Sequence, residues 1–461
     1  MKKKCDVLYV HSVREPHTME NSMFAIMPMG IIGILNGLRA KGIDVMGINL
    51  AVEKHVDPDY DLKEALKDIE YKVILTDLHW YVHSYGAMYV VEQTKAVHPE
   101  IPMIVGGYTS TIYPQEIMEN FEGVDYVVTG DSDLPMDMLV DYLLGRKDIA
   151  IEDIPNVLYR KDGEIITSEK TWAESSLDQI DFIHTDFFEH PDLVRRLTVN
   201  GVTRKFTNHW LCIARGCKFN CGYCCGSNVN MKTLFRRCNI LKRSPEKVAQ
   251  DFVALHEMGY MQISPSHDFE MFGQEYYRKI FSKIREAGVK PGMYLECFQL
   301  PSKDYIDEIA ETFEKKQVLL VISPISGNDE LRRQNGKMFS NDELYEMLKY
   351  IRKKGLPMLL YYTFNLVGET RQQFMDTIFQ MQYLGMSLKF NKNSILYQPV
   401  VLDPLAPMRS FDGITSHLNC FMDYYNHCQL PREGKYENTG YDDNNEVSVE
   451  EKLKTFDSIL S

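Results

Sequence analysis

Long apolar runs and an excess of basic charge are the two features that the sequence lacks most clearly. No apolar stretch approaches the roughly 20 residues that a membrane-spanning helix needs, and the start MKKKCDVLYVHSV has no apolar core or cleavage site of a signal peptide. The 51 lysine and arginine residues face 65 aspartate and glutamate residues, for a formal net charge of -14. Nucleic-acid affinity comes mainly from basic surface, so the charge argues against a general polyanion binder, with the local basic residues Arg236, Arg237, Lys242 and Arg243 as the exception. We expect a soluble, cytoplasmic protein that does not bind membranes.

The ten cysteines lack the regular spacing of a disulfide framework. In a chain without an export signal they are expected to be reduced thiols available for metal or redox chemistry. Four of them stand in GCKFNCGYCCG, where Cys217, Cys221 and Cys224 are spaced C-x3-C-x2-C. A zinc site normally uses a second close pair, which is missing here, and thiols that merely pack have no reason to gather with glycines in a loop. An iron-sulfur cluster with three protein ligands and one open iron is the favoured interpretation, with zinc and packed thiols as alternatives.

The order of apolar segments divides the chain into blocks. From 5 to 144, five strand-like runs alternate with amphipathic stretches, which predicts an α/β fold with an open, doubly wound parallel sheet. NVLYRKDGEIITS predicts a hairpin that turns at Asp162 and Gly163. From about 206 the alternation resumes over six strands, which predicts a complete or partial α/β barrel. The expected blocks are a first domain at 1–150, a hairpin and connector at 151–205, a barrel at 206–405, and a helical C-terminal segment with an acidic tail at 406–461.

The cysteine motif, with Tyr223 before its third cysteine, resembles the cluster loop of radical S-adenosylmethionine (SAM) enzymes. The resemblance implies a partial (β/α)6 barrel, a 4Fe-4S cluster held by Cys217, Cys221 and Cys224, and SAM bound at the open iron. In that family the reduced cluster cleaves SAM to a 5'-deoxyadenosyl radical. Cys225 directly follows the motif, and we expect it to pack beside the cluster without binding iron.

Other segments are similar to the SAM contacts of that family. The resemblance implies contacts from Tyr223 in the cysteine loop, from Ser323 in QVLLVISPISG, from Leu366 and Gly368 in FNLVGETRQQF, and from Gln398 in YQPVVLDPLAP. The second strand departs from the family, because ISPSHDF stands where a Gly-Gly-Glu-like turn is expected. This segment offers Ser264, Ser266, His267 and Asp268. We predict a catalytic role for Asp268, with a hydrogen-bonded pair of Asp268 and His267 as the alternative.

The first block resembles the cobalamin-binding domain of B12-dependent radical SAM enzymes. The segments that carry the resemblance are SMFAIMPMGIIGILNGLRAKGIDV and VGGYTSTIYPQEIMENFEGVDYVVTGDSDLP. It implies a corrinoid on the carboxyl ends of the parallel strands, with its nucleotide tail beside the sheet. The expected contacts are Pro28, Trp80, Gly106, Gly107, Thr109, Ser110 and Thr111. A tight turn is the alternative role for the two glycines, and core packing is the alternative for Trp80. Asp131 and Asp133 stand where relatives have a Gly-Glu-x-Glu run.

The segment DLHWYV, residues 77–82, is similar to the D-x-H-x-x-G motif whose histidine binds cobalt in classical cobalamin domains. Val82 replaces the glycine, and the segment follows the third predicted strand instead of the first. We therefore predict that His79 does not bind cobalt, and that Trp80 or a neighbour covers the lower face of the corrinoid.

The combined resemblance implies a methyltransferase with three cofactors, namely a 4Fe-4S cluster, SAM and cobalamin. In such enzymes one SAM methylates cob(I)alamin, and another yields the radical that activates an unreactive carbon of the substrate. The alternatives are cobalamin-dependent cyclisation or rearrangement, a radical SAM enzyme that does not use cobalamin, and an iron-sulfur scaffold or carrier. The expected partners are a small-molecule or peptide substrate and an electron donor such as flavodoxin or ferredoxin.

Overall fold

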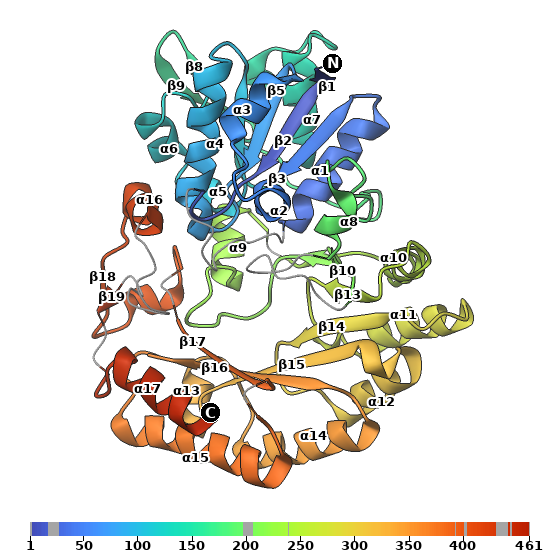
Figure 1. Ribbon diagram of the computed structural model, residues 1–461, viewed down its shortest axis with the longest axis vertical. Coiled ribbons are helices and arrows are strands. Elements are labelled where there is room, and N and C mark those ends of the chain that lie inside the picture. Colours follow the sequence, from blue (N-terminus) through green and yellow to red (C-terminus); the bar gives the residue numbers. More distant parts are fainter. Residues whose placement is uncertain are drawn as a thin grey trace. The chain divides into compact units, whose positions relative to one another are not determined.

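The computed structural model describes residues 2–16, 27–196, 206–237, 239–391, 393–400, 403–429, 441–442 and 445–460. The chain forms two compact units (Figure 1). Unit 1 comprises Met1–Lys205, Met231–Asn239 and Leu418–Pro431, and unit 2 comprises Phe206–Asn230, Ile240–His417 and Arg432–Ser461. Each unit is therefore assembled from segments that are distant in the sequence. No helix within the described ranges is long and apolar enough to cross a membrane.

Unit 1 is built on a seven-stranded sheet with the order β3-β2-β5-β6-β7-β8-β9. Its parallel strands are β2 (Val7–His11), β3 (Val45–Asn49), β5 (Val73–Asp77), β6 (Met103–Gly106) and β7 (Tyr126–Val128). Successive strands are added on opposite sides of β2, so the strand order reverses between β2 and β5. In such sheets ligands bind at the carboxyl ends of the strands beside the reversal. The prediction of a doubly wound α/β sheet is confirmed.

Helices cover both faces of this sheet because alternate strand residues feed two separate apolar clusters. Leu8 and Ile74 belong to one cluster, and their neighbours Tyr9 and Leu75 belong to the other. The first cluster includes residues of α3 (Leu62–Lys67), α4 (Ser84–Val97), α6 (Pro114–Asn120) and α16 (Phe421–Gln429). The second includes residues of α1 (Met29–Ala40) and α7 (Asp133–Leu143). Shorter elements of unit 1 are β1 (Lys3–Lys4), α2 (Leu50–Val56), β4 (Ile69–Glu70), α5 (Tyr108–Ile112) and α8 (Pro191–Val194).

The predicted hairpin is confirmed, and it extends the sheet of unit 1. Strands β8 (Val157–Lys161) and β9 (Glu164–Thr167) pair antiparallel, and β8 also pairs antiparallel with β7. Asp162 and Gly163 have φ values of 53° and 84°, as both central residues of a type I′ turn require.

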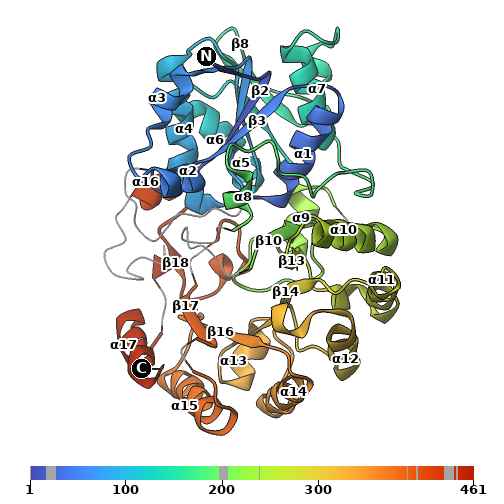
Figure 2. The same ribbon diagram turned by 45° about the vertical axis from the view of Figure 1, so that its right-hand side comes forward.

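Unit 2 contains six parallel strands in sequential order (Figure 2). They are β10 (Asn208–Leu211), β13 (Gln262–Pro265), β14 (Gly292–Cys297), β15 (Val318–Ile325), β16 (Met358–Phe364) and β17 (Ile395–Pro399). The helices between them are α10 (Pro245–Glu257), α11 (Gln274–Glu286), α12 (Lys303–Thr312), α13 (Asp329–Gln334), α14 (Asn341–Lys354) and α15 (Arg371–Leu388). The sheet order begins at β10 and ends at β17, so the described strands form an open (β/α)6 barrel, as predicted.

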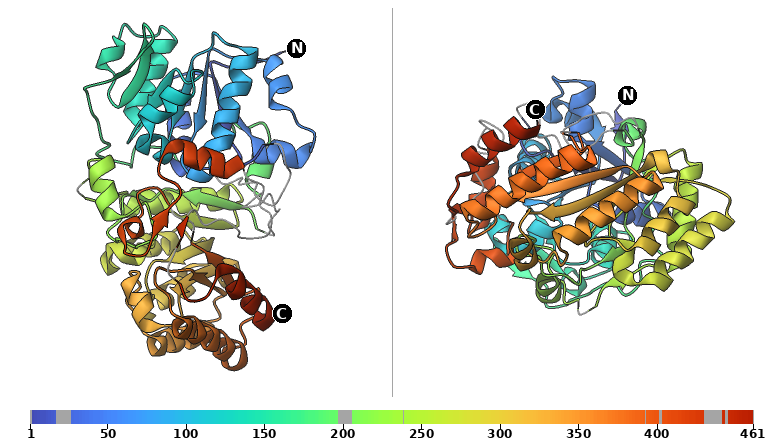
Figure 3. Two further views of the ribbon diagram at one scale, coloured as in Figure 1. Left: turned by 90° about the vertical axis from the view of Figure 1, so that its left-hand side faces the viewer. Right: turned by 90° about the horizontal axis from the view of Figure 1, so that it is seen from below.

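The C-terminal segment contributes to both units. Helix α16 belongs to unit 1, whereas α17 (Val449–Leu460) belongs to unit 2 and lies beside α15 (Figure 3). Phe456 of α17 packs on Phe374 and Tyr397, with ring centroids 5.6 and 4.7 Å apart. Lys452 forms a fully buried ion pair with Glu369, which follows β16. Helix α17 is therefore anchored to the barrel by both apolar packing and charge.

Candidate functional site

The cysteine loop lies between β11 (Ala214–Arg215) and α9 (Asn228–Leu234), directly after the first barrel strand. Gly216 opens the loop with a φ of 95°, a backbone conformation that favours glycine. Asn228 closes the loop. Its backbone N–H donates to the carbonyl of Phe219 at 2.9 Å, and its side-chain amide donates to the carbonyl of Cys217 at 2.8 Å. The loop is thus shaped by bonds within the protein.

The three motif sulfurs do not all lie within 4.8 Å of one another. Cys217, Cys221 and Cys224 are half-buried free thiols. Zinc–sulfur bonds of about 2.3 Å bring the sulfurs around one zinc ion to within roughly 4 Å of one another. Among the described residues, the group of three or more potential ligands that meets a limit of 4.8 Å lies in unit 1 and contains no cysteine. The wider spread of the three sulfurs fits a 4Fe-4S cluster, in which each thiolate binds a different iron.

Burial favours the protonated thiol at two of the three motif cysteines, Cys217 and Cys224. Burial raises the pKa of Cys217, and burial together with Asp403 raises the pKa of Cys224 to about 12. Iron must therefore displace these protons when it binds. The buried Lys337 donates to the carbonyl of Phe298 at 2.8 Å and interacts electrostatically with Cys221. Burial lowers the pKa of Lys337, whereas the nearby thiols and carboxylates act in the opposite direction.

Cys225 has its own environment beside Asp403. Its backbone N–H donates to the Asp403 carboxylate at 3.3 Å, and its carbonyl accepts from the Asn230 amide at 2.8 Å. Burial and the nearby carboxylate raise the pKa of the Cys225 thiol well above its ordinary value. The hydrogen bonds hold the Cys225 backbone, and the assignment of the iron to the other three cysteines stays a prediction.

His267 ties the end of the second barrel strand to the cysteine loop. Its Nε2 lies 2.8 Å from the carbonyl oxygen of Gly216, which can only accept, so Nε2 carries the proton. Its Nδ1 then accepts from the Ser266 hydroxyl at 2.7 Å, and that hydroxyl accepts from the N–H of Ile213 at 3.1 Å. Burial lowers the pKa of His267 to about 4, so the ring is neutral at physiological pH.

The Asp268 carboxylate accepts hydrogen bonds from two backbone N–H groups. One carboxylate oxygen accepts from the N–H of Glu270 at 3.1 Å, and the other accepts from the N–H of Phe298 at 3.0 Å. These bonds cap the turn η3 (Phe269–Phe272) and fix the end of β14. These hydrogen bonds of Asp268 and those of His267 do not join the two side chains to each other. The contacts give Asp268 a positioning role, and its predicted catalytic role receives no support from them.

Two of the expected SAM contacts share one apolar cluster. Leu366 is fully buried in a cluster against which Tyr223 of the cysteine loop packs. The other buried members are Ile325, Leu331, Val400, Ala406 and Met408. Tyr223 therefore packs against the same cluster as Leu366, which follows β16, as we expect if both residues contact SAM.

The remaining expected SAM contacts lie at or near the ends of strands. Ser323 is half-buried on β15, where the pairing with β16 shifts register. The Gln398 side chain on β17 accepts from the Tyr361 hydroxyl. Gly368 has a φ of 70° in the turn between β16 and α15, which explains a glycine there. No described contact joins these three residues to one another.

Glu296 is a charged residue of the barrel that the sequence reasoning missed. Apart from His209, it is the one residue with an ionisable acidic or basic side chain in the six barrel strands. The Tyr294 hydroxyl donates to it at 3.1 Å. Its neighbours Leu295 and Cys297 are buried, whereas Glu296 is exposed. Strand alternation in GMYLEC was the available signal, because it places Glu296 on the opposite face.

In unit 1, Gly106 and Gly107 are the glycines expected to contact the nucleotide tail, and they differ in how closely other atoms approach them. Gly107 has a φ of 121°, and a Cβ atom there would lie within 2.8 Å of the backbone of Leu78 and His79. At Gly106 a Cβ atom would meet only the carbonyl of Val128, at 3.7 Å. The close approach of the β5 and β6 ends therefore explains Gly107, which favours the alternative of a tight turn.

The expected hydroxyl donors are engaged within the protein. Thr109 donates to the carbonyl of His79 at 3.0 Å, while Ser110 and Thr111 donate to the carbonyl of Gly107 at 3.0 and 2.7 Å. A hydroxyl has one proton to donate. Direct donation from these residues to a nucleotide tail would require these bonds to break, and their contact with the tail stays a prediction.

Trp80 and Pro28 are the remaining residues of unit 1 that the sequence predicts to contact a corrinoid, and His79 lies beside Trp80. Trp80 is half-buried and meets the rings of His79 and His83 edge to face, with centroids 5.0 and 5.7 Å apart. Burial lowers the pKa of His79 to about 4. Pro28 is buried directly before α1, and the preceding residues up to 26 of its motif lie outside the described residues. The roles of Trp80, His79 and Pro28 toward a corrinoid stay predictions.

The last turn of the sheet holds a buried ion pair and a small pocket. Asp131 pairs with Arg237, a residue that follows α9, and accepts from the N–H of Glu174 at 2.9 Å. Asp133 begins α7. A pocket of about 250 Å³ opens near the ends of β7 and β9. Its lining includes Thr129, Gly130, Asn156, Trp172, Phe235 and Arg236.

Comparison with known proteins defines the class. The family described as B12 binding domain matches residues 19–140, and the Radical SAM superfamily matches residues 211–381. The chain therefore combines a B12-binding domain with a radical SAM domain. These matches agree with the resemblance found in the sequence.

Particular relatives are distant. The chain is 25% identical over 279 residues to a probable threonylcarbamoyladenosine tRNA methylthiotransferase of Pyrococcus horikoshii, covering 57% of this chain and 59% of the relative. It is 22% identical over 272 residues to a hopanoid C-3 methylase of Methylococcus capsulatus, covering 58% and 47%. The chain thus spans less than two thirds of the length of these curated relatives.

Two solved structures share the fold. The radical SAM methyltransferase TsrM from Kitasatospora setae, solved with cobalamin and a [4Fe-4S] cluster bound, matches with a TM-score of 0.70 at 14% identity. That match covers 100% of this chain and 91% of TsrM. The cobalamin-dependent SAM radical enzyme OxsB matches with a TM-score of 0.58 at 12% identity, covering 88% and 54%.

Proposed function

We propose that this protein is a cobalamin-dependent radical SAM enzyme that methylates an unreactive carbon. The observation that carries the proposal is the presence in one chain of a B12-binding domain and a radical SAM domain whose C-x3-C-x2-C loop follows the first strand of an open (β/α)6 barrel. The fold shared with TsrM, a methyltransferase, supports methyl transfer as the outcome. Rearrangement without methyl transfer is the competing proposal.

Each unit would hold its own cofactor. Cys217, Cys221 and Cys224 would bind three irons of a 4Fe-4S cluster, and SAM would bind the open iron near Tyr223 and Leu366. Cobalamin would bind at the carboxyl edge of the sheet in unit 1, over residues 1–150. Together these groups supply radical generation and methyl transfer when bound. Lys337 adds positive charge beside the loop, while His267 and Asp268 hold the backbone around it.

The reaction needs a source of electrons, since radical SAM chemistry starts from a reduced cluster. We propose a flavodoxin or ferredoxin as the donor and a small molecule or peptide as the substrate. A cytoplasmic location, where thiols stay reduced, belongs to the same proposal.

Methyl transfer can be tested without knowing the substrate. Full-length protein is reconstituted anaerobically with iron, sulfide and cobalamin, reduced, and mixed with SAM that carries a deuterated methyl group. We expect mass spectrometry to find the label on the protein-bound corrinoid. An unlabelled corrinoid in protein that retains both cofactors would contradict methylation and favour rearrangement chemistry. The matched control is the Cys225→Ala variant, which is expected to give the same label.

A further inference from the structure

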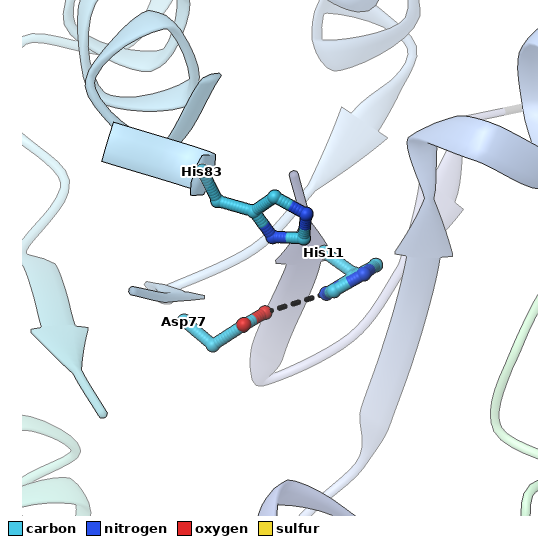
Figure 4. A group of neighbouring side chains, drawn as sticks. All are labelled: His11, Asp77 and His83. Carbon is cyan, nitrogen blue, oxygen red and sulfur yellow. Dashed lines mark hydrogen bonds and ion pairs between the residues drawn. The ribbon is translucent and has the colours of Figure 1, made fainter. Parts of the chain in front are cut away.

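His11, Asp77 and His83 form a buried cluster in unit 1 that the proposed function does not use (Figure 4). His11 ends β2 and Asp77 ends β5, so these two residues flank the reversal of strand order. His83 lies in the turn η1 (Tyr81–His83), which precedes α4. The side chains of His11 and Asp77 are 0% and 5% exposed, and His83 is 0% exposed. Three elements therefore contribute one side chain each to a site closed to solvent.

The three side chains converge closely enough to share one ion. One ligand atom from each lies within 4.8 Å of the other two, and in the described part of the chain no other such group occurs. His11 Nδ1 lies 2.7 Å from Asp77 Oδ1, and the rings of His11 and His83 meet edge to face with centroids 5.3 Å apart. In the cysteine loop, which lies within the described ranges, no three potential ligand atoms lie within 4.8 Å of one another.

The Asp77 carboxylate supplies an independent indication of a ligand. Its Oδ1 accepts from the Tyr9 hydroxyl at 2.6 Å and pairs with His11. Its Oδ2 is buried and has no hydrogen-bond partner among the described residues. A buried carboxylate oxygen without a partner costs free energy. A cation bound at this oxygen would remove that cost.

We propose that His11, Asp77 and His83 bind one divalent transition-metal ion, for which Zn2+ is the best-suited ion. Two imidazoles and one carboxylate form a common donor set of zinc sites with three protein ligands. Binding through His11 Nδ1 requires the neutral ring with its proton on Nε2, so the proton that Nδ1 shares with Asp77 moves to Nε2, and an imidazolium ring would instead release one proton to solvent. The ion then replaces that hydrogen bond with one coordinate bond from His11 Nδ1 and one from the Asp77 carboxylate. The ion links β2, β5 and η1, the turn before α4. It therefore stabilises the carboxyl ends of the two strands that flank the reversal of strand order.

The proposal is tested by metal analysis of the full-length chain. The background variant Cys217→Ala/Cys221→Ala/Cys224→Ala removes the cysteine loop as a source of bound metal. This variant is expressed without cobalamin in zinc-supplemented medium, dialysed against metal-free buffer, and measured by inductively coupled plasma mass spectrometry. We expect about one zinc per chain. Asp77→Asn and His83→Ala, added to this background, should each lower the zinc content at least about tenfold, as loss of a ligand implies.

His79→Ala is the matched control, because His79 lies four residues before His83 but outside the cluster, and it should keep the zinc. Zinc-free background protein, or full zinc content in Asp77→Asn, would overturn the proposal. If a variant fails to fold, the background protein is loaded with Co2+ and its X-ray absorption spectrum is measured. Imidazole nitrogen ligands of the Co2+ would support the site, and their absence would overturn it. In cobalamin-loaded protein, an imidazole splitting of the cob(II)alamin spectrum that His83→Ala removes would place His83 on cobalt and also overturn the site.

Discussion

The Nε2–H of His267 donates a hydrogen bond of 2.8 Å to the carbonyl oxygen of Gly216, the residue directly before the first cysteine of the loop. His267 follows β13 and lies 51 positions after Gly216 in the sequence. The bond therefore couples the second barrel strand to the start of the cysteine loop. It gives the protein a means of holding Cys217 in place that does not involve the metal.

Replacement of His267 by alanine should loosen the loop without removing any cysteine. We expect His267→Ala to assemble a cluster that is lost several times faster under a chelator, followed by its visible absorbance. His267→Gln is the control, because its side-chain amide still offers a donor to the Gly216 carbonyl. Equal rates of cluster loss in wild type and His267→Ala would show that the hydrogen bond has no role in holding the loop.

The cysteines should differ sharply in their contribution to the cluster. Reconstituted wild type is expected to bind about four irons, and Cys217→Ala, Cys221→Ala and Cys224→Ala should each lose most of them. Cys225→Ala should keep its iron, because Cys225 lies outside the C-x3-C-x2-C spacing and alanine retains the backbone N–H that donates to Asp403. Iron and sulfide analysis measures both outcomes. A Cys225→Ala protein as poor in iron as Cys224→Ala would show that the ligand set is wrong.

The adjacent glycines of unit 1 offer a matched pair. Gly107→Ala should destabilise the protein by about 1 to 3 kcal/mol, because its φ is left-handed and the added Cβ clashes with the backbone of Leu78 and His79. Gly106→Ala should be nearly neutral, since its Cβ meets one atom at 3.7 Å. Urea unfolding without cobalamin measures both. A neutral Gly107→Ala that weakens only cobalamin binding would restore the role in tail binding.

Asp268 should make stability depend on pH in the acidic range. Burial raises its pKa from 3.8 to about 6, so the folded protein binds a proton there more tightly than the unfolded chain does. Its contribution to stability is therefore complete below about pH 4 and is lost as pH rises through about 6. The expected loss is on the order of 2 to 3 kcal/mol. Urea unfolding of wild type and Asp268→Asn between these pH values measures it, and parallel pH profiles would contradict the assignment.

Features that are local in the sequence were predictable. The five parallel strands of unit 1, the hairpin at Asp162 and Gly163, and the six strands of the barrel follow from hydrophobic periodicity and turn residues. That the barrel is open was implied only by the family resemblance. The cysteine motif was visible because its ligands lie within eight consecutive residues.

Features that depend on distant contacts were not predictable. His11 and Asp77 are 66 positions apart, and only the pairing of β2 with β5 brings them together. Lys452 and Glu369 are 83 positions apart, so nothing local showed that α17 is anchored to the barrel. The hydroxyls of Thr109 and Thr111 were expected to face a ligand, but the tight turn at Gly107 offers them nearer carbonyl acceptors.

The most direct test of the central claim is the retention of both cofactors by one chain. Full-length protein is reconstituted anaerobically with iron, sulfide and hydroxocobalamin, passed through gel filtration, and analysed for iron and cobalt. The account predicts about four irons and about one cobalt per chain, with a cob(II)alamin spectrum that lacks imidazole splitting and does not change in His79→Ala. Protein that holds the iron but no cobalt would contradict the account and leave a radical SAM enzyme that does not use cobalamin.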